Sequence, residues 1–503
     1  MLVLIIVVAS SQPIKQNSWC AYALLILISL GFLFSAYQLY QGGLTLLSYR
    51  QSWKIATGSL GVDFRHAIFG SGPQTFLSDF SQFRNLEHNA TATWNMRFGS
   101  AGSELLNLLA TGGFGLILAV LAVVLTGIRY LRNYYIYYRH SLSSSISLPA
   151  SHINGLVLGL SLSTLCAIFL PFPFLMYFVV FALLGLLFSQ LKLQKSPGIT
   201  EIETASLNVG VPIGLIGLIG LICLFFLGRF WLAEFKLQQS VNAANRNDGR
   251  ATYTLQLEAQ RLNSWQPGYF MALAQTNLLI ADNLASRKDL TDADKQTIQG
   301  LIQQSIAFAR AATALSPNNP IVWENLAGIY RNLLNFAEGA DQWAVAAYQQ
   351  VIATDPLNPR IRLDLGGIFF AKKDYQNAAL NFQNAVNLKP DYANARYNLA
   401  QAYLNLNMIE AGRAELTATQ NLICPPAPDA ADCKKVEEEL KALPTPSPTP
   451  TPEASPSPSA PNTPTPTPKS TAAPRPKITI TPKATLSPTT TPAPPVASPL
   501  VSP

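Results

Sequence analysis

The chain has 503 residues, of which 13% are charged and 49% are hydrophobic, and its formal net charge is +7. This length allows two or three domains. The low charge and the positive mean hydropathy exclude a compact cytosolic enzyme and indicate an integral membrane protein with a water-soluble appendage. The basic residues are scattered rather than gathered on one face, which argues against a nucleic-acid-binding protein.

Five long apolar segments predict a bundle of membrane-spanning helices at residues 1–235. Each is close to the roughly 20 residues that cross the hydrocarbon core of a bilayer. Basic residues follow the second and the fourth segment, so the positive-inside rule places these two loops in the cytoplasm. By alternation, the loop at 41–104 and the chain after Trp231 lie outside. The segments are Trp19–Tyr40, Leu105–Ile128, Ile153–Leu170, Phe172–Leu191 and Val209–Phe230, and the basic residues are Arg129, Arg132, Arg139, Lys192 and Lys195.

The first nine residues, Met1–Ala9, are apolar but long enough for only half a bilayer. They lack the basic front of a signal peptide. This pattern predicts the end of an interrupted span, with further helices encoded upstream. A diverged, shortened copy of a larger membrane enzyme is the alternative.

A repeated helical pattern begins after the last span and extends over about residues 250–440. Leu365 and Leu399 are 34 residues apart, whereas Leu326 precedes Leu365 by 39, which fits a five-residue insertion around Asn335–Gln342. Small and aromatic residues recur with the leucines at helical spacing. They are Trp323, Ala327, Tyr330, Gly366, Phe369, Ala378, Phe382, Ala385, Ala400 and Tyr403, and Pro390 follows at the end of a unit.

This pattern resembles the tetratricopeptide repeat (TPR), in which small residues let two antiparallel helices approach each other and Pro ends the second helix. A degenerate unit from Trp265 to Pro317 precedes the clear repeats. We therefore expect an α-solenoid of about four helix pairs. Such solenoids commonly bind peptides or protein surfaces, which implies a protein or peptide partner.

The cysteines divide into two groups. Cys424 and Cys433 flank a Pro-rich loop and would form a disulfide if this region faces an oxidising compartment, whereas two unpaired thiols are the alternative. The other three lie in apolar spans without metal-ligand spacing, so we expect no metal site. They are Cys20, Cys166 and Cys223.

The end of the chain, residues 444–503, consists mainly of Pro, Thr, Ser and Ala. This composition cannot form a core and predicts a disordered tail. Pro-rich chains of this kind also act as extended spacers, so a spacer that crosses a cell wall is the alternative interpretation.

The outward loop at 41–104 concentrates ionisable residues of the membrane half. Arg50 has a Trp three positions on, and a Phe-Gly-x-Gly turn at Phe69–Gly72 leads to Phe76. The next span opens Glu-Leu-Leu-x-Leu-Leu-Ala at Glu104 and reaches Gly113. Together these motifs resemble the O-antigen ligase and polymerase family of polytopic membrane glycosyltransferases.

The resemblance implies transfer of a glycan from a polyprenyl-diphosphate donor at the outer face of the membrane, without a metal or another cofactor. Arginines of the loop would hold the diphosphate, because a planar guanidinium binds phosphate oxygens in pairs. Arg50 is the first candidate, followed by Arg65, Arg84 and Arg97. Alternatively, the last three reach lipid headgroups or pair with acidic residues of the loop, namely Asp63, Asp79 and Glu87.

The sequence departs from the family at the expected catalytic base. Gly102 and Ser103 stand where the family carries His-Asn before the last outward Glu. His88 or Glu104 would then serve as the base from a shifted position, or the activity is lost.

Two functions fit these observations. The first is a membrane glycosyltransferase of cell-envelope polysaccharide assembly, which transfers or polymerises a lipid-linked glycan while its repeats bind an acceptor or a partner protein. The second is a non-catalytic, membrane-anchored TPR scaffold for protein–protein interaction, which the missing histidine favours. A transporter is disfavoured because the charges lie in a loop rather than inside spans. Both functions imply an integral protein of the cytoplasmic membrane, in contact with membrane lipids, with the repeats and the tail outside the cytoplasm.

Overall fold

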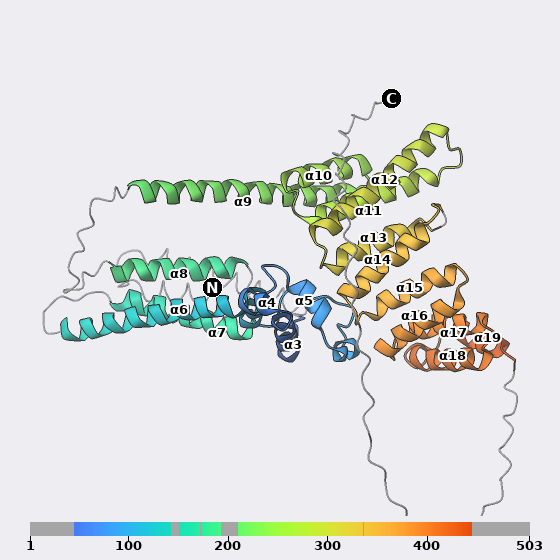
Figure 1. The fold of residues 1–503 in the computed structure, drawn as a ribbon, viewed down its shortest axis with the longest axis horizontal. Coiled ribbons are helices and arrows are strands. Elements are labelled where there is room, and N and C mark those ends of the chain that lie inside the picture. Colours follow the sequence, from blue (N-terminus) through green and yellow to red (C-terminus); the bar gives the residue numbers. More distant parts are fainter. Residues whose placement is uncertain (1–44, 142–149, 172–173, 193–209, 335, 445–503) are drawn as a thin grey trace, which may run out of the picture. The chain divides into compact units, whose positions relative to one another are not determined.

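A computed structural model describes residues 45–141, 150–171, 174–192, 210–334 and 336–444. All regular secondary structure within these ranges is helical, as the sequence predicts. The expected first span Trp19–Tyr40, the start of the chain and the Pro-rich tail lie outside them. The helices, labelled as in Figure 1, are α3 (Tyr49–Leu60), α4 (Phe64–Phe69), α5 (Phe76–Phe83), the short 3₁₀ helix η1 (Leu86–Ala90), α6 (Glu104–Ser141), α7 (Ala150–Phe169), α8 (Phe174–Lys192), α9 (Gly210–Asn245), α10 (Gly249–Leu262), α11 (Pro267–Ala285), α12 (Asp292–Leu315), α13 (Pro320–Asn332), α14 (Ala340–Thr354), α15 (Pro359–Ala371), α16 (Tyr375–Leu388), α17 (Ala393–Asn405), α18 (Ile409–Ile423) and α19 (Ala431–Ala442).

Four of the predicted spans correspond to helices α6, α7, α8 and α9, and the first three lie side by side (Figure 1). Within the described residues, Glu104–Arg129 and Gly217–Asn245 are long and apolar enough to cross a bilayer, judged by length and composition. Among the described residues, only 11% and 6% of their most apolar windows are buried. Helix α9 continues past the predicted end of the span at Phe230 to Asn245.

Residues 45–104 of the predicted outward loop are folded. Helices α3, α4 and α5 pack against the beginning of α6 and bury a small apolar core. Burial of a large apolar side chain contributes roughly 1.5–3 kcal/mol, so even this small core holds the loop in a defined conformation. The core residues are Leu47, Ile55, Ala56, Phe76, Phe80, Ala101, Leu106, Leu109 and Ala110.

Two glycines join this folded loop to α6. Gly113 interrupts α6 with φ 65°, and Gly70 of the Phe-Gly-x-Gly turn has φ 67°, values that favour glycine. A Cβ on Gly70 would lie 2.3 Å from the carbonyl carbon of Thr111, so a larger residue would force the turn away from the helix. The backbone N–H of Ser71 donates to the carbonyl oxygen of Ala110 at 3.1 Å, near the interruption. The two glycine motifs of the sequence are therefore one structural feature.

The repeats form four helix pairs, α11/α12, α13/α14, α15/α16 and α17/α18, with α10 before them and α19 after them. The leucines at the same place in three repeats, Leu326, Leu365 and Leu399, are 5%, 4% and 0% exposed, which places them in the core. A Cβ on Gly366 would lie 2.5 Å from the ring of Phe382, which explains why the pattern has a small residue there. The predicted repeat core is confirmed.

The repeat helices begin at recurrent local signals. Asn319 and Asn358 each accept a hydrogen bond through the side-chain oxygen from the backbone N–H two residues on, at 3.0 and 3.1 Å. A Pro at the first helical position follows each of them, where its missing N–H costs nothing.

Neighbouring repeat helices are antiparallel, so their connections lie on two opposite edges of the solenoid. We call the edge with the turns 316–319, 355–358 and 389–392 the inter-repeat edge. The other, with the turns 333–339, 372–374 and 406–408, is the intra-repeat edge. The turn 333–339 is longer than its two counterparts and contains much of the insertion that the spacing predicts.

A disulfide between Cys424 and Cys433 joins the end of α18 to α19 across a Cα–Cα distance of 5.2 Å. Of the two possibilities that the sequence leaves open, the structure has the bonded form. Glu437 lies near both sulfurs, but the disulfide uses the thiolate groups that a metal ion would need.

Candidate functional site

The outward loop contacts the inter-repeat edge of the repeats through buried polar groups. We call this interface the clasp. The loop residues are Arg84, Asn89, Trp94 and Arg97, and the repeat residues are Glu324, Asp355, Leu357, Leu388, Lys389 and Tyr392.

The clasp is centred on Asp355, which stands just before the first Pro of an inter-repeat turn. Arg84 Nη2 lies 3.1 Å from Asp355 Oδ1, and their side chains are 2% and 0% exposed. Arg97 donates through Nε and Nη2 to Asp355 Oδ2 at 3.1 and 2.9 Å, and through Nη1 to Glu324 at 2.7 Å. Two guanidinium groups thus face two carboxylates, and the buried charges balance.

The second part of the clasp involves Asn89. Its side-chain N–H group donates to the carbonyl oxygens of Leu357 at 2.9 Å and Leu388 at 3.1 Å, one from each of two successive repeats. In return, Lys389 Nζ donates to the backbone oxygen of Asn89 at 2.9 Å. The clasp therefore bridges two repeats.

An aromatic contact completes the clasp. The rings of Trp94 and Tyr392 are 5.0 Å apart between centroids, and Lys389 Nζ lies 5.0 Å from the Trp94 ring centroid. A cation over an aromatic face is attracted by the ring quadrupole. This contact involves the turn that follows α16.

Asp355 and Lys389 occupy equivalent places in two repeats, since Pro356 and Pro390 follow them 34 residues apart. Both side chains are almost fully buried and both contact the loop. Charged side chains are rarely buried unless they are paired. The sequence thus shows two charged residues at equivalent turn positions, which is a sign that they are paired. It does not show that the loop residues are their partners.

His88, one of the two candidate bases, is 1% exposed. Its ring packs edge-on against Phe80 and Phe98, and its Nδ1 lies 3.4 Å from the Gln51 side-chain oxygen. Burial, together with the nearby Arg84 guanidinium, lowers the pKa of His88. The imidazole is therefore neutral at pH 7, as a base must be, but it is enclosed.

Glu104, the other candidate base, is also 1% exposed. Its carboxylate accepts hydrogen bonds from the hydroxyl of Tyr177 on α8 and from the side chain of Asn107, the latter at 3.1 Å. Glu104 thus contacts residues of α6 and α8, whereas His88 contacts residues of the loop, so the two candidate bases lie in different surroundings. The role of either residue as a base remains a prediction.

The position where the resembled family has a histidine is closed in this protein. A Cβ on Gly102 would lie 2.0 Å from the carbonyl oxygen of Leu47, and the backbone N–H of Gly102 donates to Ser52 Oγ at 2.9 Å. A side chain at position 102 would therefore require the chain at Leu47 to move.

The four arginines expected at a diphosphate have different surroundings. Arg84 and Arg97 lie in the clasp, where carboxylates occupy their guanidinium groups. Arg50 is 73% exposed and lies 3.4 Å from Glu87, which the sequence offered as a partner only for the other three arginines. Arg65 is exposed on α4. Of these four arginines, only Arg50 and Arg65 have the exposure that contact with a diphosphate would require.

The loop contains one buried carboxyl group that the sequence analysis did not single out as a site. Asp79 accepts a hydrogen bond from Ser71 Oγ at 2.5 Å, and Ser71 Oγ lies 2.5 Å from Thr75 Oγ1. Burial raises the pKa of Asp79 to about 6, and the hydrogen bonds from Ser71 and Ser59 oppose this rise. No periodicity or motif identifies such a group in the sequence, because its burial depends on the packing of α5 against α3 and α6.

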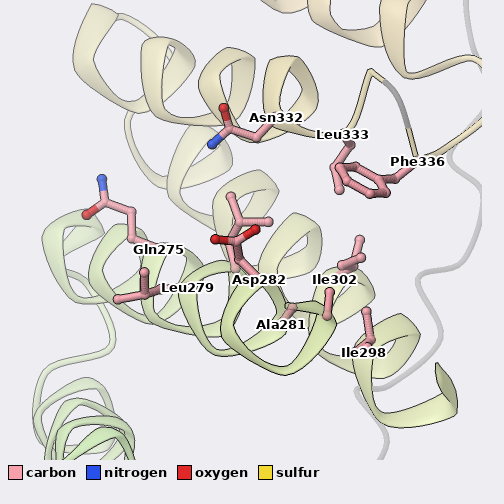
Figure 2. Close-up of a pocket in the computed structure, with 11 residues that line it drawn as sticks. Gln275, Leu279, Ala281, Asp282, Ile298, Ile302, Asn332, Leu333 and Phe336 are labelled. Atoms are coloured by element: carbon pink, nitrogen blue, oxygen red, sulfur yellow. The ribbon is translucent and has the colours of Figure 1, made fainter. Parts of the chain in front are cut away.

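The repeats also contain a cavity of about 580 Å³ at their intra-repeat edge, between the α11/α12 pair and the end of α13 (Figure 2). Most of its lining is aliphatic or aromatic, and Asp282 is the one ionisable residue among the lining residues. They are Gln275, Leu278, Leu279, Ala281, Asp282, Ala285, Ile298, Ile302, Asn332, Leu333 and Phe336.

Two family models match the chain, and both describe the repeats. One, described as TPR repeat, matches residues 366–407, and the other, described as tetratricopeptide repeat, matches residues 342–386. The C-terminal region therefore carries TPR repeats, as its period predicts. No curated protein matches the chain.

Solved structures, among them two that are described as TPR proteins, are similar to the chain. A thermophilic TPR protein of Thermus thermophilus is 18% identical over 42% of this chain and 100% of its own, with a TM-score of 0.30. MamA of Desulfovibrio magneticus is 15% identical over 40% and 98%, with a TM-score of 0.30. YrrB, described as a TPR protein with an unusual peptide-binding site, is 12% identical over 40% and 90%, with a TM-score of 0.29.

Proposed function

We propose that this protein is a membrane-anchored TPR scaffold, in which the outward loop holds the repeats near the membrane so that they bind a protein or peptide partner. The clasp is the observation that carries this proposal. It uses Arg84 and Arg97, half of the arginines expected at a diphosphate, to bind repeat carboxylates. TPR repeats support protein–protein interaction.

The apolar helices support the membrane anchor. The windows in α6 and α9 leave most of their apolar side chains exposed, whereas a core helix of a soluble protein would bury them. Because α9 runs without interruption from its apolar part into the polar residues before α10, it would connect the membrane directly to the repeats.

The disulfide supports a location outside the cytoplasm. Disulfides persist in oxidising compartments and are rare in the cytosol. The Cys424–Cys433 bond lies at the end of the repeats, on the side of the membrane to which the positive-inside rule assigns them. The contact between the loop and the repeats supports the same side for both.

A glycosyltransferase is the second candidate, and one observation favours it. Arg50 is largely exposed, Lys54 is 41% exposed beside it, and both lie within 4 Å of Glu87. A diphosphate could displace this carboxylate and bind both cations. The polyprenyl-diphosphate glycan and membrane lipids remain proposed partners on this basis.

Quantitative mass spectrometry of co-purifying proteins tests the scaffold function. Full-length protein is isolated from the cells that make it, alongside a form that lacks residues 250–443 and an Arg50→Ala variant. The scaffold predicts a set of proteins that is lost with the repeats and retained by Arg50→Ala. If the form that lacks the repeats isolates the same set of proteins, the scaffold function is contradicted.

Glycan transfer in lipid nanodiscs tests the second candidate. With a polyprenyl-diphosphate glycan as donor, a transferase loses activity in Arg50→Ala but keeps it in the control Arg331→Ala, which changes a repeat arginine paired with Asp364. A natural protein that transfers no glycan would remove the enzyme from consideration.

A further inference from the structure

The cavity at the intra-repeat edge has the composition of a peptide-binding groove. Leu279 of α11 is 62% exposed and Phe336 of the long turn is 76% exposed, although both are large apolar residues. Figure 2 shows Asn332, Leu333 and Phe336 on one side of the cavity and the side chains of α11 and α12 on the other. Exposed apolar groups around a hollow of this size are typical of binding sites.

The groove depends on the repeat insertion. Phe336 belongs to the turn 333–339. The turns 372–374 and 406–408 of the next repeats are shorter and contain no residue equivalent to Phe336. The groove is therefore a feature of this pair of repeats rather than of the repeat fold as such.

The groove remains accessible while the clasp is formed. The clasp uses the inter-repeat turns 355–358 and 389–392, and the groove uses the intra-repeat turn 333–339. These turns lie on opposite edges because neighbouring helices are antiparallel. A ligand in the groove and the loop in the clasp do not compete for the same residues.

The charge of the groove determines which ligand it fits. Asp282 is exposed, and its carboxylate lies in the space between α11 and the side chains of Asn332, Leu333 and Phe336 (Figure 2). Its backbone oxygen accepts a hydrogen bond from Ser286, but no described residue forms an ion pair or hydrogen bond with its carboxylate. One acidic group among aliphatic side chains complements a cation within an apolar segment.

We infer that this groove binds a short peptide segment of a partner protein that carries aliphatic side chains and one Lys or Arg. The aliphatic side chains contact Leu279, Ile298, Ile302 and Phe336, and the basic residue pairs with Asp282. This inference rests on the proposed scaffold function and identifies the chemical class of its partner.

Selection from a random 12-residue phage-displayed peptide library tests this inference. The full-length protein in nanodiscs is compared with Asp282→Lys and with the control Asp292→Lys, which makes the same change at a fully solvated site on α12. A selected peptide is then synthesised with its basic residue and with Glu in its place, and binding is measured by fluorescence anisotropy. A Phe336→Ser variant tests the apolar contacts.

The natural protein and Asp292→Lys should select aliphatic peptides with a Lys or Arg, and the Glu form should bind about tenfold more weakly. Asp282→Lys should reverse this preference, and Phe336→Ser should weaken both forms. Selection of peptides without a basic residue, no selection at all, or an unchanged preference in Asp282→Lys would overturn the inference. The scaffold function fails separately, if the co-purifying proteins persist without the repeats.

Discussion

Asp79 is a carboxyl group that the fold holds away from water, and this has a measurable consequence. Its hydrogen bonds from Ser71 and Ser59 only partly offset the loss of hydration, so the neutral form is favoured up to about pH 6. His88 lies in the same loop, and its pKa is shifted in the opposite direction. Burial and the nearby Arg84 lower the pKa of His88, which keeps its ring neutral. Burial thus favours the neutral form of both groups.

The pKa shift of Asp79 predicts how stability depends on pH. Since the folded pKa of about 6 exceeds the unfolded value of 3.8, the unfolded state loses its proton first. The free energy of unfolding should therefore fall as the pH rises from about 4 to 6. Asp79→Asn should remove this dependence and be more stable at pH 7 by up to about 3 kcal/mol.

Denaturant unfolding of the full-length protein in detergent, followed by fluorescence between pH 4 and 8, measures this effect. Asp63→Asn is the control. Asp63 is exposed, and its hydrogen bonds with His66 lower its pKa, so the sign of its contribution is opposite. A natural protein and an Asp79→Asn variant with parallel pH profiles would refute the role assigned to Asp79.

At the scale of elements, the clasp connects the loop between α5 and α6 with the repeat turns through paired charges. A buried ion pair contributes little compared with apolar packing, but removal of one partner leaves a buried charge without compensation. Asp355 faces two guanidinium groups, so its replacement affects both.

Asp355→Asn should therefore destabilise the contact between loop and repeats by about 3–5 kcal/mol. Hydrogen exchange should show faster exchange in residues 84–97 and in the turn 355–358, while the apolar helices α6 and α9 remain protected. Asp292→Asn is the matched control, because the Asp292–Lys295 pair is exposed and such pairs contribute at most about 1 kcal/mol. Equal exchange rates in the two variants would be incompatible with the clasp.

The disulfide makes a separate contribution at the end of the repeats. It closes a loop with a sequence separation of 9 between α18 and α19. In the chain-entropy model a loop of this size contributes roughly 2–3 kcal/mol. Cys424→Ala with Cys433→Ala should thus increase hydrogen exchange in α19, whereas Cys223→Ala, at a free and exposed cysteine, should not. No change in α19 would show that the bond is dispensable there.

At the scale of the whole molecule, the sequence predicted the elements well because periodicity is a local signal. The 34-residue spacing located the repeats, and apolar length located α6 to α9. The clasp was missed because it joins residues 227 to 300 positions apart. Arg84 and Arg97 were expected at a phosphate because a guanidinium binds phosphate and carboxylate in the same way, and a sequence shows the group without its partner.

The groove could not be predicted from the sequence either, although the insertion next to it was visible in the repeat spacing. The spacing located the insertion near Asn335–Gln342 but could not show that Phe336 would be exposed beside α11. Exposure depends on how the turn folds over a neighbouring pair of helices. The missing histidine was visible, but only the structure shows that Leu47 closes the place of Gly102.

The most direct measurement for this account is photo-crosslinking in intact membranes, with p-benzoylphenylalanine in place of Trp94. The Trp94 ring lies beside Tyr392 and Lys389, so mass spectrometry should find crosslinks to the turn 389–392. The same amino acid in place of Trp265, which is 84% exposed, is the control and should give no crosslink to that turn. Crosslinks from position 94 only to lipid or to other proteins would contradict the central claim, that the outward loop holds the repeats.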